Sequence, residues 1–184
     1  MQLIEDYTFE KINKIERAEY YNCTFLNCNL ESSDLSRFVF EYCSFIDSNI
    51  SNSKLYDTAF KTVLFSNCKL LGLDFSNCNN FLLKLKFADC NLNFSSFYQL
   101  DIKSSTFYNC SLQEVDFTSS NLAKSVFEHC NLGSSVFENT NLSHVNFSTA
   151  INYTINPQIN ELKGAKFSQE QIAGLLKHLD IVIQ

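Results

Sequence analysis

The chain has 184 residues, of which 45% are hydrophobic, and its formal net charge is −6 with a pI of about 5.0. This length suffices for one domain with a substantial core, and the acidic balance argues against direct nucleic-acid binding, which needs clustered Lys and Arg. The first residues, MQLIEDYTFE, are acidic where a secretion signal is basic, and no stretch approaches the roughly 20 apolar residues that span a bilayer. We therefore expect a cytoplasmic protein without a membrane segment.

A hydrophobic residue recurs at every fifth place from Phe25 to Phe75 and, after a shift of two, from Leu82 to Phe147. All 25 of these positions are Phe, Leu or Ile, and the residue two places earlier is usually Cys, Ser or Thr. A period of five fits neither the α-helix nor the alternation of a strand. One large and one small inward position in each five predict a tube that is filled by its own wall.

Grouping the large positions in fours indicates the number of sides. One column is then entirely Phe, from Phe25 to Phe147, and the next is entirely Leu or Ile, from Leu30 to Leu132. Stacked coils of 20 residues with four sides give this pattern. After Phe87 a period of 10 explains the sequence equally well, so the choice of four sides depends on the first half.

The motif resembles the pentapeptide-repeat proteins, whose consensus is a small residue, Asp or Asn, Leu or Phe, a polar residue and any residue. It is seen in Ser120-Asn121-Leu122-Ala123-Lys124 and in Cys130-Asn131-Leu132-Gly133-Ser134, and the resemblance covers roughly residues 15–152. It implies an all-β fold, a right-handed quadrilateral β-helix, to which the C-terminal residues of this sequence add a short capping helix. We predict a single domain overall, with the β-helix at 1–152 and a capping and dimerisation module at 153–184.

All eight cysteines fall on the small inward position. In a four-sided tube Cys68, Cys90, Cys110 and Cys130 stack in consecutive coils, about 4.8 Å apart. Such a column cannot converge on Zn²⁺ at about 2.3 Å per bond, and the spacing disfavours disulfides. We expect buried free thiols in a reducing compartment, with no metal site and no cofactor.

The five-residue period ends after Phe147. Ser168 and Gln171 have capping-box spacing and precede apolar residues at helical spacing, which predicts a helix over 169–179. The apolar run at 181–183 predicts a short strand. This segment is expected to shield the open end of the tube and, as a hypothesis, to pair two chains. The residues expected to form that homodimer contact are Ile172, Leu175, Leu176, Leu179, Ile181 and Ile183.

The ending AKFSQEQIAGLLKHLDIVIQ and the early repeats YYNCTFLNCNL resemble the quinolone-resistance (Qnr) branch of the family. That resemblance implies a rod-shaped dimer that binds DNA gyrase or topoisomerase IV and imitates duplex DNA. Qnr proteins carry sizeable loops that break the coils, whereas the interruption here is a two-residue shift within SNCNNF at 76–81. A relative without such loops could still bind the enzyme and inhibit it instead of protecting it.

Charge is expected to be sorted by side. One side exposes Asp34, Asp57, Asp74, Asp116 and Glu138, and an adjoining side exposes Asp47, Asp89 and Glu128. The side whose central inward residues run from Phe40 to Leu142 exposes Lys61, Lys84, Lys103, Lys124 and His144. Six to seven coils make a rod of roughly 30–35 Å, and duplex DNA of that length carries roughly 20 charges. Because the whole chain has a net charge of only −6, any imitation of DNA is local.

Nothing in the sequence predicts an enzyme, since it has no glycine-rich phosphate loop, nucleophile elbow or metal-ligand spacing. The predicted function is binding to a type II topoisomerase as a partial DNA mimic, with the eight carboxylates as contacts. Alternatively, the acidic sides serve only solubility, and the protein is a general interaction scaffold. The exposed contacts of such a scaffold are Leu71, Tyr56, Phe94, Tyr98 and Tyr108.

Overall fold

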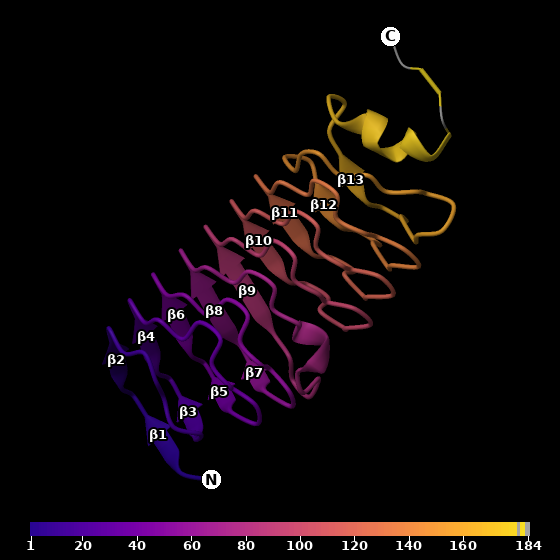
Figure 1. The fold of residues 1–184 in the computed structure, drawn as a ribbon. Coiled ribbons are helices and arrows are strands. Elements are labelled where there is room, and N and C mark those ends of the chain that lie inside the picture. Colours follow the sequence, from indigo (N-terminus) through magenta and orange to yellow (C-terminus); the bar gives the residue numbers. More distant parts are fainter. Residues whose placement is uncertain (180, 183–184) are drawn as a thin grey trace.

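The computed structural model describes residues 1–179 and 181–182. Its paired strands are parallel and form a four-stranded and a nine-stranded sheet. Successive coils stack along one axis from the indigo N-terminal end to the yellow C-terminal end (Figure 1), and they make a β-solenoid of about eight turns. The quadrilateral β-helix that the five-residue period predicts is confirmed. None of the helices in the described residues is long and apolar enough to cross a membrane.

The strands are short and belong to two ladders. The four-stranded sheet consists of β1 (Leu3–Glu5), β3 (Glu19–Tyr21), β5 (Val39–Glu41) and β7 (Ala59–Lys61). The nine-stranded sheet consists of β2 (Thr8–Glu10), β4 (Thr24–Leu26), β6 (Ser44–Ile46), β8 (Val63–Ser66), β9 (Leu85–Ala88), β10 (Thr106–Tyr108), β11 (Val126–Glu128), β12 (Asn146–Phe147) and β13 (Lys166–Phe167). The described helical turns are the 3₁₀ segments η1 (Phe75–Asn77), η2 (Ile172–Leu175) and η3 (Lys177–Leu179). The ladders thus extend from Leu3 to Phe167.

Each coil has four sides, which we name A to D in chain order. Side A is the nine-stranded sheet and side D contains the four-stranded sheet, while isolated bridges such as Asn29 to Asn49 and Asp74 to Ser96 hold sides B and C. Because the chain passes A, B, C and D before it returns to A, side C lies opposite side A. Side B lies opposite side D for the same reason.

The chain turns its corners at residues in the left-handed conformation. Among the described residues, 26 other than Gly have a positive φ, typically two places after a central hydrophobic residue, as at Asn27 and Asp47. Asn and Asp tolerate this conformation because their short polar side chains hydrogen-bond locally. This repeated corner explains how a chain with only 4 Gly and 1 Pro can turn so often.

The large inward positions fill the tube. Of the 25 predicted positions, 24 have side chains that are at most 3% exposed. The rings of side A stack from coil to coil, so that Phe107 lies between Phe87 and Phe127 with centroid distances of 5.1 and 4.6 Å. A second aromatic column begins on side D and continues on side C, the two parts meeting where Phe60 and Phe75 are 6.2 Å apart.

Leu82 is the exception among the inward positions. It is 63% exposed, with a φ of 59°, and the prediction that it points inward is wrong. The bridge from Ala59 to Asn79 puts Asn80 opposite Phe60, so the two extra residues enter after the side D position and before side A resumes. Leu83 then packs against the core.

The small inward residues bond to the preceding coil. Ser53 Oγ and Thr58 Oγ1 donate to the carbonyl oxygens of Leu30 and Leu35 at 2.7 and 2.8 Å. All eight cysteines are buried and free, as expected. The predicted column of Cys68, Cys90, Cys110 and Cys130 is confirmed. The residue after each of these cysteines forms a backbone bridge with its counterpart in the next coil, from Lys69 to Asn131. A buried thiol therefore serves as a small, weakly polar packing group here.

We expect the protein to lose stability as the pH rises above 9. Burial raises the pKa of the Cys43 thiol from 9.0 to about 12, and burial likewise raises the pKa of Tyr20 to about 12. As the pH rises, these groups ionise in the unfolded chain before they ionise in the folded protein. Their contribution to stability is therefore complete below their pKa in the unfolded chain, and it is lost as the pH rises toward their pKa in the folded protein. Urea midpoints are expected to agree at pH 7 and 8 and to fall by pH 10.5. A midpoint that is unchanged at pH 10.5 contradicts this, and Cys43→Ser is expected to make the decline shallower.

The C-terminal segment closes the end of the tube with 3₁₀ turns. The helix expected over 169–179 is present only as η2 and η3, although Ser168 Oγ accepts the Gln171 N–H at 3.3 Å as the capping spacing predicts. Gly174 is buried, and its carbonyl oxygen accepts the Ile155 N–H at 3.1 Å. Residues 181 and 182 belong to no strand, so the strand expected at 181–183 is wrong for these two. Ile183 lies outside the described residues.

Candidate interaction surface

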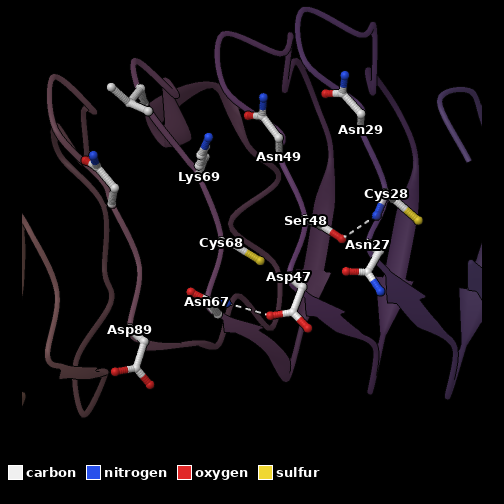
Figure 2. Close-up of a pocket in the computed structure, with 12 residues that line it drawn as sticks. Asn27, Cys28, Asn29, Asp47, Ser48, Asn49, Asn67, Cys68, Lys69 and Asp89 are labelled. Carbon is white, nitrogen blue, oxygen red and sulfur yellow. Dashed lines mark hydrogen bonds between the residues drawn. The ribbon is translucent and has the colours of Figure 1, made fainter. Parts of the chain in front are cut away.

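The packed lumen leaves the outer walls as the surface available to a partner. Within residues 1–179 and 181–182, no three His, Cys, Asp or Glu side chains are grouped as a metal site requires. An open groove of about 660 Å³ runs along the edge between sides A and B (Figure 2). Most of the residues that line it are polar and come from successive coils, with Asn27, Asp47, Asn67 and Asp89 along one margin.

Side C carries the first predicted set of carboxylates. These are Asp34, Asp57, Asp74, Asp116 and Glu138. Four of them are exposed and Asp116 is half-buried. The row is not uniformly negative, because Lys54 occupies the bridge position next to Asp34, and Ser96 stands between Asp74 and Asp116. Side C is thus acidic overall, with its charges separated along the rod.

Three of the side C carboxylates also hold the backbone. Oδ1 of Asp34, Asp74 and Asp116 accepts the N–H of the residue two places later at 2.8–3.0 Å. Hydrogen bonds from the side chain and backbone of Ser36 lower the pKa of Asp34. The amide oxygens of Asn49 and Asn131 likewise accept the N–H of the residue two places later. An Asp→Asn substitution therefore removes the charge and keeps the acceptor.

Side A carries the second predicted set, Asp47, Asp89 and Glu128. Asp47 and Asp89 stand at the corner toward side B, where each accepts a hydrogen bond from the Asn of the next coil. The distances are 2.6 Å from Asn67 Nδ2 to Asp47 Oδ1, drawn in Figure 2, and 2.7 Å from Asn109 Nδ2 to Asp89 Oδ1. These contacts fix both carboxylates on a ladder of amide groups.

The two acidic sets do not form one continuous surface. The expectation that they lie on adjoining sides is wrong, because sides B and D separate side A from side C. The expectation assigned each residue to a column correctly but did not follow the order in which a coil visits the columns. A partner that lies flat against side C meets five of the eight carboxylates, and the other three lie on side A or at its corner with side B.

Positive charge gathers on side D and at its corner with side A. The predicted residues there are Lys61, Lys84, Lys103, Lys124 and His144. Lys61 Nζ lies 3.2 Å from Glu41 Oε2, and Lys103 Nζ lies 3.2 Å from Asp101 Oδ2. Part of this positive charge is therefore neutralised within the chain.

Exposed apolar side chains are a second kind of candidate contact. Tyr56 and Phe94 are 60% and 57% exposed, Tyr98 and Tyr108 are also exposed, and Leu71 is half-buried. The sequence reasoning missed Phe81, which is 69% exposed. The available signal was the apolar pair Phe81-Leu82, because the coils before and after have Lys61-Thr62 and Lys103-Ser104 at this corner.

Comparisons with known proteins agree with this architecture. A model described as a pentapeptide repeat region matches residues 18–97 and 81–167. The fold is similar to a trypsin-treated variant of QnrB1, a plasmid-mediated fluoroquinolone resistance protein, with a TM-score of 0.65 and 14% identity over 100% of this chain and 99% of that chain. It is also similar to HetL, a pentapeptide repeat protein involved in heterocyst differentiation regulation from the cyanobacterium Nostoc sp. strain PCC 7120, with a TM-score of 0.58 and 14% identity over 91% of this chain and 86% of that chain. No curated protein matches the sequence.

Proposed function

Because the chain belongs to the pentapeptide-repeat family, we propose that this repeat scaffold is a non-enzymatic binding protein whose partner is a type II topoisomerase. Side C is the contact surface and acts as a local imitation of the DNA backbone. The observation that carries the proposal is the row of carboxylates that the backbone of side C holds at regular coil intervals. The sequence resemblance to the Qnr branch supplies the class of partner.

The number of charges limits the footprint. About eight turns at about 4.8 Å give a rod of roughly 40 Å, over which duplex DNA carries roughly 23 charges. Side C offers five carboxylates and also carries the cations of Lys54 and Arg37. The contact therefore covers a few phosphate positions of a DNA-binding surface and does not replace a duplex along its whole length.

The proposal includes a homodimer formed by the C-terminal module. Ile172, Leu179 and Ile181 are 46%, 45% and 56% exposed, although η2 and η3 already cover the end of the tube. Leu175 and Leu176 are half-buried. An apolar edge that remains beyond the cap is suited to a second copy, which would cover it and extend the rod.

A supercoiling assay with purified DNA gyrase and topoisomerase IV tests the proposal. The protein is expected to inhibit the enzyme, or to relieve its inhibition by a quinolone, at low micromolar concentration. The variant Asp57→Asn/Asp74→Asn/Asp116→Asn is expected to need an at least tenfold higher concentration, as an estimate from interface hot spots. Asn keeps the backbone hydrogen bonds, so the melting temperature is expected to remain close to that of the native protein.

The opposite side supplies a control with the same change in net charge. Asp47→Asn/Asp89→Asn/Glu128→Gln is expected to retain the native effect on the topoisomerase. An equal loss in both triple variants would assign the effect to net charge and not to side C. No effect of the native protein on either enzyme would remove the topoisomerase proposal.

A general protein-interaction scaffold is the second candidate function. The observation that favours it is the exposure of Tyr56 and Phe94, together with Arg37, whose guanidinium carbon lies 5.8 Å from the centroid of the Tyr56 ring. Large side chains of this kind are enriched at the energetic centres of protein interfaces. The absence of any effect of the native protein on both topoisomerases would favour a scaffold with another partner.

A further inference from the structure

The interruption of the repeat places two large apolar side chains in water. Phe81 and Leu82 are 69% and 63% exposed, and they occupy the centre of a turn in which the Leu83 N–H lies 3.4 Å from the Asn80 carbonyl oxygen. Leu82 has a φ of 59°, a conformation that suits Gly or Asn much better than Leu. Neither side chain stabilises the core, because Leu83 takes the inward place.

Polar residues would serve the fold better at both positions. The coils on either side have Lys61-Thr62 and Lys103-Ser104 at the same corner. Two adjacent, exposed apolar side chains at a strained turn are therefore not explained by packing within the chain. Such a feature is typical of a contact with another molecule.

Two lysines and an apolar notch lie next to this turn. Lys84 and Lys86 are exposed, and Lys86 pairs across the sheet with Leu64, which is 36% exposed. The notch has a volume of about 160 Å³ and is lined by Thr62, Val63, Leu64, Lys84 and Lys86. Among the residues that the structure describes, neither Lys84 nor Lys86 forms an ion pair.

We propose that Leu64, Phe81, Leu82, Lys84 and Lys86 form a docking patch for an acidic protein segment that carries a large apolar side chain. The notch accepts the apolar side chain between the two lysines, Phe81 and Leu82 cover it, and the carboxylates of the segment pair with Lys84 and Lys86. Charge selects this occupant, because the patch is positive on a chain whose net charge is −6. The patch lies at the corner between sides D and A, so the inference is independent of side C and of the topoisomerase.

Fluorescence anisotropy with short labelled peptides tests the patch. The first probe combines Glu residues with Phe and Leu, the second replaces its Glu with Lys, and the third replaces its Phe and Leu with Ser. The full chain is expected to bind the first probe and to bind the other two at least about tenfold more weakly. Binding of the first probe is expected to weaken as salt rises, because part of the attraction is between exposed charges.

Two variants and a matched control locate the site. Phe81→Ser/Leu82→Gly and Lys84→Glu/Lys86→Glu are each expected to weaken binding about tenfold, which is the effect of removing an interface anchor. Lys124→Glu/Lys163→Glu makes the same change of charge farther along side D and is expected to leave binding unchanged. Gly suits the left-handed turn, so the first variant is expected to melt no lower than the native chain.

Three results with the patch variants and the probes would overturn the proposal. They are retention of binding in both patch variants, equal binding of the acidic and basic probes, and no binding of the acidic probe at millimolar concentration. Equal weakening in the Lys124 and Lys163 control would also do so, because it would assign the effect to general charge.

Discussion

Replacing Phe107 with alanine is expected to lower the free energy of unfolding by about 3–5 kcal/mol. The Phe107 ring is fully buried and stacks on Phe87 and Phe127, with interplanar angles of 12° and 3°. Its edge contacts are with Phe97 and Phe117 on the opposite side of the tube. These neighbours are held by strands or bridges of their own coils, so the cavity cannot close by a small shift of one side chain. Urea unfolding followed by circular dichroism measures the loss.

Phe94→Ala provides the control for this substitution. Phe94 is 57% exposed at a corner and is expected to change the free energy of unfolding by less than about 0.5 kcal/mol. The loss of unfolding free energy for Phe107→Leu is expected to lie between those of Phe107→Ala and Phe94→Ala. Leucine is buried at the equivalent central position on side B, so the tube can accommodate it. A loss below about 1 kcal/mol for Phe107→Ala would contradict a continuously stacked core.

Gly174→Ala is expected to detach the C-terminal cap. A Cβ atom on Gly174 would clash with the carbonyl oxygen of Tyr153 and would lie 2.9 Å from its Cδ2 atom. Backbone cannot yield as a flexible side chain can, so η2 must move away, and it gives up the hydrogen bond from Ile155 and the packing of Leu175. The expected cost is about 3 kcal/mol, at the upper end for overpacking a core. Hydrogen exchange is expected to show loss of protection at residues 153–175 and native protection in the coils.

The same variant tests the proposed dimer. Light scattering at micromolar concentration is expected to give the mass of two chains for the native protein and of one chain for Gly174→Ala. Gly133→Ala is the control, because the nearest contact of an added Cβ there is 3.5 Å away and the φ of Gly133 is not positive. A native protein with the mass of one chain would remove the dimer, whereas full protection in Gly174→Ala would instead contradict the packing of the cap.

The repeating part of the fold could be predicted because one physical requirement recurs at every coil. Each side needs one large and one small inward residue, and the sequence from Phe25 to Phe147 shows this directly. The stacked thiols from Cys68 to Cys130 follow from the same rule. The error at Leu82 arose where the rule lapses, because a count of fives cannot show on which side of a residue an insertion enters.

The candidate site was less predictable, because it depends on which columns face the same direction. The residues of each acidic column follow from the period, but the opposition of sides A and C follows from the path of the whole coil. The dual role of Asp74 and Asp116 was also hidden, since a sequence shows a charge and not the N–H that it accepts. The C-terminal turns were expected as an α-helix because apolar spacing alone does not distinguish that helix from successive 3₁₀ turns.

The ladder of side A passes the two-residue insertion without a break. Phe65 and Phe87 remain stacked at 5.4 Å with an interplanar angle of 10°, and β8 still pairs with β9 through four consecutive residues. Extra length added at this corner is directed outward while the aromatic column remains aligned. The corner between Asn80 and Leu85 is therefore a place where the rod can gain a longer appendage, by evolution or by engineering, without a new core having to be built.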